Sequence, residues 1–188
     1  MDVKLKEQDM LFAGFGGQGL QLSSLLLTIA AANEGKNALH YSEYTGEVRG
    51  GIIICTVVVA DAERQIFSPK REKAQVVVAM SRSAFQRYEN AVRPGGYLFV
   101  NSSLIPTETN RDDITAVYIP FNDLAREAGD ERTLSMVLVG AIAQKLGTVS
   151  VQSLLDATPE VFPPHRQRLV PTNQKAIAKG AEFIQKGA

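Results

Sequence analysis

The chain has 188 residues, 45% of them hydrophobic, which is enough to bury the core of one large domain. Its 20 basic residues balance its 20 acidic residues, which excludes a global electric field that would attract nucleic acid or a membrane surface. Its single cysteine excludes an internal disulfide framework and an iron–sulfur cluster held by cysteines of this chain.

The N-terminal residues do not resemble a signal peptide. Residues 1–7 read Met-Asp-Val-Lys-Leu-Lys-Glu, which lacks the apolar run that such a peptide needs. No apolar stretch of the chain approaches the roughly 20 residues that span a membrane. We therefore expect a cytoplasmic protein that binds neither membrane nor nucleic acid.

The first elements are predicted to be a strand, a glycine turn and a helix. The apolar residues 10–13 run directly into four glycines, Gly14, Gly16, Gly17 and Gly19. After Gln18 and Gly19, leucine and isoleucine recur with helical spacing until near Gly35. Glycine permits positive φ and lets another group approach the backbone closely. The start of the helix then offers free N–H groups to an anion.

Three interpretations of this turn stay open. Its G-x-G-x-x-G spacing matches the dinucleotide fingerprint in the required strand–turn–helix context, which would indicate NAD or FAD. That fingerprint usually has an acid at the end of the second strand, where this chain has Leu39, His40 and Tyr41, and Glu43 comes late. Alternatively, the glycines only let the helix pack tightly on the sheet. In the third interpretation, a partner subunit or a shared substrate packs against the turn.

Strands continue along the chain at regular intervals. Asn37–Tyr44 predicts a second strand, and the almost wholly apolar Ile52–Ala60 predicts a strand covered on both faces. Between them, residues 42–51 form a loop rich in charge and glycine. Further strands are predicted at residues 74–80, 97–101 and 116–119.

Helices are predicted from apolar spacing between a polar N-cap and a stop. They are the helix from Ser81 to before Arg93, residues 121–128 capped by Asn122 or a neighbour, residues 133–146 stopped by Gly147, the short helix after Ser150, and the final helix from Thr172 or Asn173 to about Gln185.

The alternation of strands and helices predicts a Rossmann-like α/β fold. The sheet should be mostly parallel, with helices on both faces and a helical C-terminal segment. In such sheets ligands and partners meet the carboxyl ends of the strands. The glycine turn and the loop at 42–51 both follow strands, so we expect them to form one surface.

The ordered set of motifs resembles a known family. Gly-Phe-Gly-Gly-Gln-Gly at 14–19, Gly-Glu-Val-Arg-Gly-Gly at 46–51 and Cys-Thr-Val-Val-Val-Ala-Asp at 55–61 resemble the gamma subunit of 2-oxoacid:ferredoxin (or acceptor) oxidoreductases. The resemblance extends over most of the chain, through Pro94-Gly95-Gly96 to Gly180. It implies one gamma-type domain, of the pyruvate/ketoisovalerate oxidoreductase kind, over residues 1–188, and the Glu-Val-Arg-Gly-Gly form is more similar to the 2-oxoglutarate branch than to the pyruvate branch.

The resemblance implies a reaction carried out by several subunits. A 2-oxoacid is decarboxylated on thiamine diphosphate, electrons pass to an iron–sulfur protein, and coenzyme A receives the acyl group. This chain has neither a Gly-Asp-Gly motif for Mg²⁺ and diphosphate nor cysteine ligands for clusters, so those groups belong on alpha, beta and delta-type partner subunits. Ferredoxin or flavodoxin would accept the electrons. The chain would be required but not catalytic alone, and whether it contacts coenzyme A is left open.

The expected ligand- or partner-binding residues lie in the two loops. They are Gly14, Gly16, Gly17, Gln18, Gly19, Glu43, Tyr44, Glu47, Arg49, Gly50 and Gly51. The guanidinium of Arg49, oriented by Glu47, would reach a partner carboxylate or a phosphate of coenzyme A. In the alternative, the two residues form an ordinary solvated ion pair.

Several other polar residues are expected to have structural roles or to be solvated. We expect a buried Cys55, a hydrogen-bonded His40 at the end of its strand, a surface His165, and a solvated basic patch of Lys70, Arg71 and Lys73. Two other functions also remain open, a stand-alone NAD- or FAD-binding oxidoreductase domain and a pure assembly scaffold.

Overall fold

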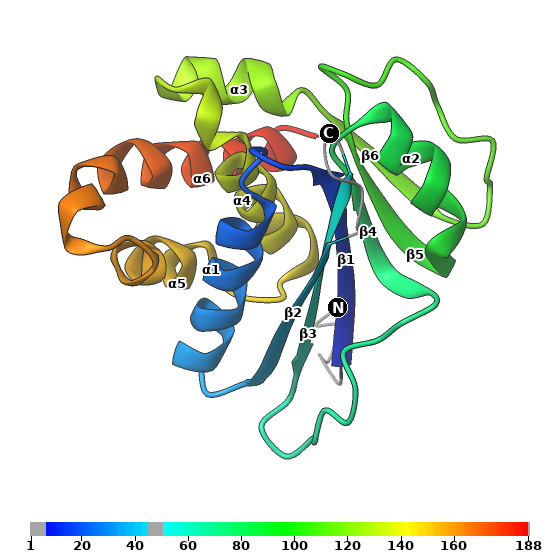
Figure 1. The fold of residues 1–188 in the computed structure, drawn as a ribbon, viewed down its shortest axis with the longest axis horizontal. Coiled ribbons are helices and arrows are strands. Elements are labelled where there is room, and N and C mark those ends of the chain that lie inside the picture. The colour runs from blue at the N-terminus through cyan, green and yellow to red at the C-terminus, as the bar shows by residue number, and fades with distance from the viewer. Residues whose placement is uncertain (1–6, 45–50, 188) are drawn as a thin grey trace.

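A six-stranded mixed sheet forms the centre of the molecule (Figure 1). The computed structural model describes residues 7–44 and 51–187, with only the backbone of Tyr44. The strand order is β2-β3-β1-β4-β5-β6. Strand β3 is antiparallel to both of its neighbours, whereas β1, β4, β5 and β6 are parallel to one another. The strands are β1 Glu7–Phe15, β2 Asn37–Tyr44, β3 Ile52–Ala60, β4 Ala74–Ala79, β5 Val92–Asn101 and β6 Thr115–Ile119.

Helices cover the two faces of the sheet unequally. One face carries most of them, α1 Leu20–Asn33, α3 Phe121–Ala128, α4 Leu134–Leu146, α5 Val151–Ala157 and α6 Val170–Gln185. The other face carries α2 Arg82–Tyr88. Short 3₁₀ turns complete the connections, η1 Glu89–Ala91, η2 Glu131–Thr133, η3 Thr158–Val161 and η4 Pro164–Leu169.

Alternating side chains of the strands feed two separate cores. Met10 and Phe12 of β1 enter the larger core with α1 and α4, and Leu11 and Ala13 enter the smaller core under α2. This period of two is the expected geometry of a strand. Because β1 is covered on both faces, seven of its nine residues are buried. The strand is longer than the run of four apolar residues from which it was predicted.

Helices α4 and α6 pack with almost no space between their backbones. A Cβ atom on Gly140 would lie 2.0 Å from the carbonyl oxygen of Ile177, and one on Gly180 would lie 1.9 Å from that of Val137. No side-chain rearrangement relieves a clash with backbone. The glycine at 180, which belongs to the family resemblance, is therefore explained by helix packing.

The predicted fold class is confirmed, and several boundaries are corrected. Strands β2 and β3 have the predicted limits, and Ser81 and Ser150 cap α2 and α5 as expected. Strand β5 begins earlier than predicted, and α6 begins at Val170 rather than at Thr172 or Asn173 because Pro171 occupies its first turn, where proline is tolerated.

The predicted cap of α3 was wrong. No side chain caps that helix, and Asn122 instead accepts a hydrogen bond from the Asn101 amide (2.9 Å) and donates one to Glu131 (2.8 Å). Nor is any helix within residues 7–44 and 51–187 both long enough and apolar enough to cross a membrane.

Candidate functional site

The glycine turn between β1 and α1 is shaped by two residues with positive φ. Gly17 has φ 91°, and Gly19, the N-cap of α1, has φ 75°. A Cβ atom on Gly19 would also lie 2.5 Å from the hydroxyl oxygen of Ser135, in the first turn of α4. Both conformation and packing therefore require glycine at position 19. The contact with Ser135 was not anticipated, because no local pattern links residues so far apart in the chain.

Gln18 braces the turn from inside. Its Oε1 accepts a hydrogen bond from the Phe15 N–H (2.7 Å), and its Nε2 donates to the carbonyl of Met80 (2.9 Å) at the end of β4. A Cβ atom on Gly14 would lie 2.4 Å from that Oε1. Gly14 and Gln18 thus fix the path of the turn, and the amide of Gln18 makes its hydrogen bonds within the chain.

Gly16 differs from its neighbours because nothing described in the chain requires glycine there. It is exposed and does not have a positive φ, and the nearest atom to an added Cβ is Cδ1 of Ile53 at 3.7 Å, an ordinary contact. Among the described residues, no atom lies within 4 Å of a Cβ added at Gly17 either. Residues 7–44 and 51–187 therefore leave this part of the turn accessible to a group arriving from outside.

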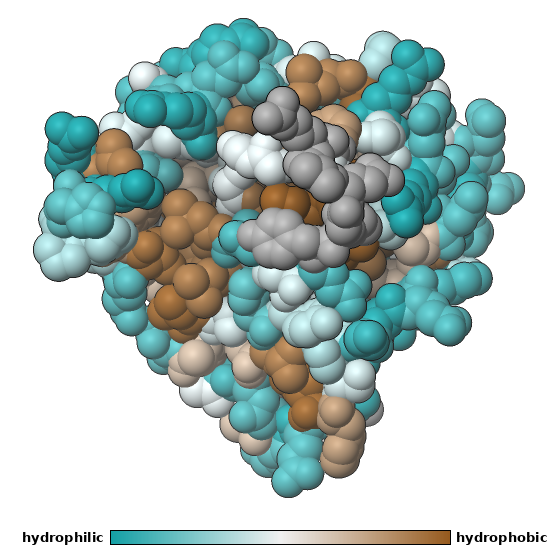
Figure 2. Space-filling model, in the orientation of Figure 1, coloured by the Kyte–Doolittle hydropathy of each residue, from teal (hydrophilic) through white to brown (hydrophobic). Residues whose placement is uncertain are grey.

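A groove of about 590 Å³ runs from the turn along the first part of α1. The N-cap of α1, Gly19, has no side chain to cap the helix, and the first turn contains no acidic residue, so the described residues of this turn do not offset the positive end of the helix dipole. Figure 2 shows apolar side chains gathered over α1. The groove is lined by Phe15, Gly17, Gly19, Leu20, Gln21, Leu22, Leu25, His40, Ile53 and Arg166. Arg166 was not predicted as a site residue, because it lies in η4, far along the chain from the glycine turn.

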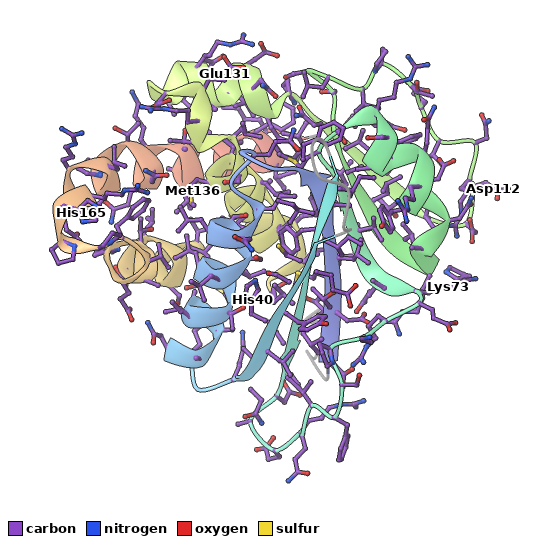
Figure 3. The ribbon with its side chains drawn as sticks, in the orientation of Figure 1. His40, Lys73, Asp112, Glu131, Met136 and His165 are labelled. Carbon is purple, nitrogen blue, oxygen red and sulfur yellow. The ribbon has the colours of Figure 1, made fainter. Side chains whose placement is uncertain are left out.

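His40 forms one wall of this groove as a neutral imidazole (Figure 3). Its Nε2 lies 2.9 Å from Oγ of Ser24 and 3.2 Å from Oγ of Ser42. Both hydroxyls have acceptors of their own, the Leu20 carbonyl and the Cys55 sulfur, so the consistent arrangement has Nε2 as the donor. Burial lowers the pKa of His40, which keeps it uncharged at neutral pH. The expected hydrogen-bonded role is confirmed, but His40 lies within β2 rather than at its end.

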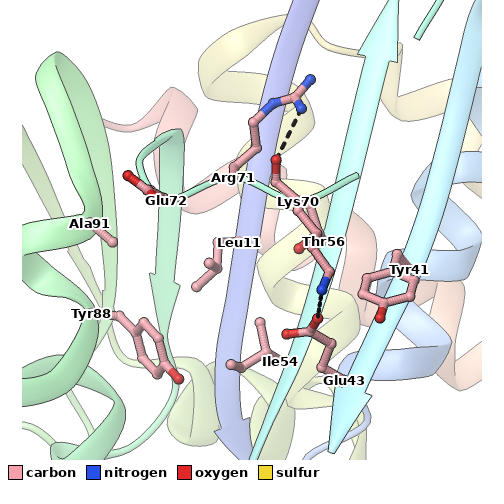
Figure 4. A pocket seen from close by; sticks show the side chains of 10 residues that line it. All are labelled: Leu11, Tyr41, Glu43, Ile54, Thr56, Lys70, Arg71, Glu72, Tyr88 and Ala91. Atoms are coloured by element: carbon pink, nitrogen blue, oxygen red, sulfur yellow. Dashed lines mark hydrogen bonds and ion pairs between the residues drawn. The ribbon is translucent and has the colours of Figure 1, made fainter. Parts of the chain in front are cut away.

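Glu43 points to the opposite face of the sheet. Successive residues of a strand face opposite ways, so Tyr41 and Glu43 line a second pocket, of about 540 Å³, on the α2 side (Figure 4). Its apolar floor includes Leu11 and Ile54, and Tyr88 stands across from Tyr41. Burial raises the pKa of the Tyr88 phenol, which remains a neutral hydrogen-bond donor. Glu43 lies 3.9 Å from Nζ of Lys70, a loose and exposed ion pair.

The prediction of one shared surface is corrected for Glu43 and is otherwise not tested, because residues 45–50 of the loop lie outside the described residues. The register places Phe15 opposite Ile52 and Tyr44 opposite Ile53, so the ends of β1 and β2 do meet at one edge of the sheet. The glycine turn and the side chain of Glu43 nevertheless serve different faces, because the strand pleat sends Glu43 away from α1.

Comparison with known proteins identifies the family. The sequence matches the family described as Pyruvate ferredoxin/flavodoxin oxidoreductase over residues 9–183. The chain belongs to this family. It is 31% identical to the 2-oxoglutarate synthase subunit KorC of Methanothermobacter thermautotrophicus, over 96% of this chain and 97% of that one. The chain is thus a gamma-type subunit of a 2-oxoacid:ferredoxin oxidoreductase, and the predicted resemblance is confirmed.

Solved structures of the family share its fold. The gamma subunit of a keto/oxoacid ferredoxin oxidoreductase from Geobacter sulfurreducens superposes with a TM-score of 0.82 at 25% identity, covering 96% of this chain and 99% of that one. A 2-oxoglutarate:ferredoxin oxidoreductase from Magnetococcus marinus, solved with 2-oxoglutarate, coenzyme A and succinyl-CoA bound, superposes with a TM-score of 0.85 at 20% identity. The match covers 97% of this chain but 32% of that one, so the gamma-type fold there is part of a longer polypeptide.

The remaining predicted residues of the gamma subunit are placed only in part. Gly51 lies just before β3 and is half-buried, and Tyr44 ends β2. Glu47, Arg49 and Gly50 lie outside the described residues, so their predicted roles stay predictions. Within residues 7–44 and 51–187, no group of three or more His, Cys, Asp and Glu side chains is arranged to hold a metal ion.

The prediction that Arg71 belongs to a solvated basic patch was wrong, because this side chain is mostly buried and paired. Its Nε donates to Asp9 (3.1 Å), a carboxylate that is 1% exposed, and a terminal nitrogen donates to Glu7 (2.9 Å). Arg93 also donates to Asp9, and the N–H of Gln75 lies 2.9 Å from the same carboxylate. Burial raises the pKa of Glu7, but the guanidiniums of Arg64 and Arg71 outweigh it and lower that pKa overall. The sequence shows these charges but not that strand order brings them together.

Proposed function

We propose that this chain is the gamma subunit of a 2-oxoglutarate:ferredoxin oxidoreductase, with residues 1–188 forming one gamma-type domain. The complex would convert 2-oxoglutarate, coenzyme A and oxidised acceptor into succinyl-CoA, CO₂ and reduced acceptor. The supporting observation is the 31% identity to KorC, which extends over nearly the whole length of both chains. Ferredoxin or flavodoxin serves as the acceptor.

The proposal assigns the redox and carbanion chemistry to alpha, beta and delta-type partner subunits. Cluster ligation needs several cysteine thiolates, whereas this chain has one cysteine, Cys55, which is completely buried in β3 beside Ser42. The residues of this chain therefore do not fit an iron–sulfur cluster. Thiamine diphosphate, Mg²⁺ and the clusters belong on those partners, and the gamma subunit supports the reaction by binding and positioning.

The glycine turn is the proposed contact with coenzyme A or a partner subunit. The space that the described residues leave at Gly16 and Gly17, together with the N-terminus of α1 beside it, suits an anionic group, whether a phosphate of coenzyme A or a carboxylate. Gly14 and Gln18 hold the turn in shape for that contact. The full proposed set consists of Gly14, Gly16, Gly17, Gln18, Gly19, Glu43, Tyr44, Glu47, Arg49, Gly50 and Gly51.

The strand order does not favour a stand-alone dinucleotide-binding domain. In the dinucleotide fold the second strand lies beside the first, and its terminal acid reaches the ribose. Here the antiparallel β3 separates β1 from β2, and Glu43 faces the sheet surface away from the turn. The acid therefore cannot serve a nucleotide held at the glycine turn.

Reconstitution with partner subunits tests the proposed function. The complex should reduce a viologen dye in the presence of coenzyme A with 2-oxoglutarate in preference to pyruvate or 2-oxoisovalerate. The isolated chain should be colourless and inactive. Preference for another 2-oxoacid would reject the assigned substrate, and dye reduction by the chain alone would reject its non-catalytic role.

Substitutions of Arg49 distinguish a contact with coenzyme A from a contact with a partner subunit. In the reconstituted complex, Arg49→Lys and Arg49→Ala should weaken one interaction by about 2–5 kcal/mol if the guanidinium meets a buried anion, since lysine cannot reproduce its paired hydrogen bonds. Lower subunit affinity identifies a partner carboxylate, and a raised KM for coenzyme A with intact assembly identifies a phosphate. Wild-type behaviour in both measurements would reject the functional interpretation of this loop.

A further inference from the structure

The pocket on the α2 side of the sheet is separate from the groove at the glycine turn and has the lining of a ligand site (Figure 4). Its volume of about 540 Å³ falls within the range typical of small-molecule sites. Helix α2 packs on β1 and β4, and the pocket lies beside it over β3 and β2. Leu11 and Ile54 form its apolar floor, while Tyr41 and Tyr88 stand on opposite sides. The pocket is therefore a second candidate site, on the opposite face from α1.

The strand register places the polar and aromatic groups of this pocket side by side. Thr56 of β3 lies opposite Leu11 of β1 on one side and opposite Tyr41 of β2 on the other. The next position on the same face pairs Ile54 with Glu43. Opposite side chains of antiparallel strands have Cβ atoms about 4.5–5.5 Å apart, so one small group can contact several of these residues at once.

Thr56 contributes a hydroxyl that the described part of the chain leaves without a partner. The residue is 7% exposed and lines the pocket, and no residue within 7–44 and 51–187 forms a hydrogen bond with its side chain. Buried polar groups are nearly always hydrogen-bonded, to protein, to water or to a ligand. A group that enters the pocket therefore finds an available hydrogen-bond partner in Thr56.

Glu43 presents a carboxylate that is only weakly paired. Nζ of Lys70 lies 3.9 Å from Oε1 of Glu43, beyond hydrogen-bond distance, and the Lys70 side chain is 75% exposed. An exposed pair of this kind contributes little to stability, so a better-oriented cation can displace Lys70. A planar cation with two parallel N–H groups would give the carboxylate paired charge-assisted hydrogen bonds.

Tyr41 offers a ring on which such a cation can stack. Its side chain is exposed, and among the described residues no aromatic ring or cation lies against it. Tyr88, by contrast, already has the guanidinium of Arg87 5.7 Å from its ring centre. The face of a tyrosine ring attracts a cation electrostatically, and arginine-like planar groups stack on it.

The charges around the pocket favour a cation over an anion. The donors of Arg71 are already used by two carboxylates and a carbonyl outside the pocket. The other charged groups of the lining are two carboxylates, Glu43 and Glu72, and one ammonium, Lys70. This balance disfavours anions such as coenzyme A or a 2-oxoacid.

We propose that this pocket binds a planar cation of the guanidinium or amidine class. The flat face of the cation stacks on Tyr41, and its paired N–H groups donate to the carboxylate of Glu43. The hydroxyl of Thr56 accepts a further hydrogen bond, and the apolar part of the ligand lies on Leu11 and Ile54. Glu43, a member of the binding set proposed above, thus acts on the α2 face. This inference goes beyond the proposed function and does not depend on assembly of the complex.

Benzamidine, an aromatic amidine, tests the pocket on the isolated full-length chain. Titration followed by NMR should show saturable binding at millimolar benzamidine. Neutral benzamide should bind at least about tenfold more weakly, because it lacks the charge that strengthens hydrogen bonds to Glu43. Benzoate, an anion of the same shape, should show no saturable binding.

Variants of the pocket test the assigned contacts. Glu43→Gln should lower the affinity for benzamidine by about tenfold or more. Tyr41→Leu should lower it by about three- to tenfold, whereas Tyr41→Phe, which keeps the ring, should change it by less than about twofold. Glu63→Gln, at an exposed glutamate outside the pocket, is the matched control and should bind like wild type.

The outcomes that overturn the inference leave the proposed function intact, since the isolated chain is measured. They are no saturable binding of benzamidine, benzoate binding as tightly as benzamidine, or unchanged binding by Glu43→Gln. Circular dichroism checks that each variant folds, and the three compounds on the wild-type chain decide the charge preference even where a variant does not.

The same titration in the reconstituted complex identifies the source of the cation. Binding that persists with intact assembly supports a free small molecule as the ligand. Loss of binding on assembly, together with weaker assembly of Glu43→Gln, supports an arginine side chain of a partner subunit.

Discussion

The two ends of the sheet differ in the residues that form them, glycines at one end and paired charges at the other. At the carboxyl end of β1, the glycines form a turn that the described residues leave exposed, beside the start of α1. At the amino ends, the carboxylates of Glu7 and Asp9 bind three arginines from two segments, the connection between β3 and β4 and the start of β5, and so hold these segments together. One end keeps backbone accessible by removing side chains, whereas the other fixes a loop by burying a charge. The first end therefore leaves space for a ligand or partner, whereas the ion pairs of the second end hold the chain segments there in fixed positions.

Removal of the buried charge should have the largest effect. Asp9→Asn keeps the shape of the side chain but removes the carboxylate that pairs with Arg93 and one of the two carboxylates that pair with Arg71, so we expect a loss of about 3–5 kcal/mol in the free energy of unfolding. Urea denaturation of the isolated chain measures it. Asp112→Asn, at an exposed aspartate, should change the same quantity by less than about 0.5 kcal/mol. A loss below about 1 kcal/mol for Asp9→Asn would show that the cluster does not hold the amino end together.

Gly19→Ala should have the next largest effect, at the other end of the sheet. The positive φ disfavours any side chain by about 1–2 kcal/mol, and the new methyl group would press on the hydroxyl of Ser135. We expect a total loss of about 2–3 kcal/mol, also measured by urea denaturation. The double variant Gly19→Ala with Ser135→Gly should regain the packing part but not the backbone part. A Gly19→Ala chain as stable as wild type would contradict the left-handed cap.

Acid should destabilise the chain through Glu34, the residue that follows α1. Burial raises the pKa of Glu34, but hydrogen bonds from Lys36, Ser153 and the N–H of Ser150 prevail and lower it to about 2. Since the folded pKa lies below the unfolded value, the unfolded chain binds more protons, and stability falls as the pH drops from about 4.5 toward 2. Glu34→Gln should cost about 1–2 kcal/mol at pH 7 and reduce this slope. An unchanged slope between pH 4.5 and 2.5 would contradict the assignment.

Gly16→Ala should have the smallest effect on folding and the most informative effect on function. The methyl group meets only Ile53 at an ordinary distance, so the free energy of unfolding should change by less than about 0.5 kcal/mol. If the turn receives coenzyme A or a partner, Gly16→Val should raise the KM or weaken assembly by about tenfold without destabilising the isolated chain. Normal turnover and assembly of both variants would assign the turn a purely structural role.

Local patterns predicted the elements that depend on neighbouring residues. The limits of β2 and β3 follow from runs of strand-forming residues between glycines and polar turns, and Ser81 and Ser150 cap their helices with their own side chains. The glycine turn was predicted from spacing alone. The predicted cap of α3 was wrong because the side-chain amide of Asn122 forms hydrogen bonds with Asn101 and Glu131 instead of with the backbone of the helix.

The sequence by itself determined the fold class, the family and the position of the glycine turn, because these depend on composition, periodicity and motifs within short stretches. Only the tertiary structure decided that β3 runs antiparallel between β1 and β2, and that Glu43 therefore faces away from the turn. It likewise decided that Arg71, expected to be solvated, binds a fully buried Asp9 that lies 62 residues away in the chain. Such pairings depend on strand order, which long-range packing selects and no local pattern records.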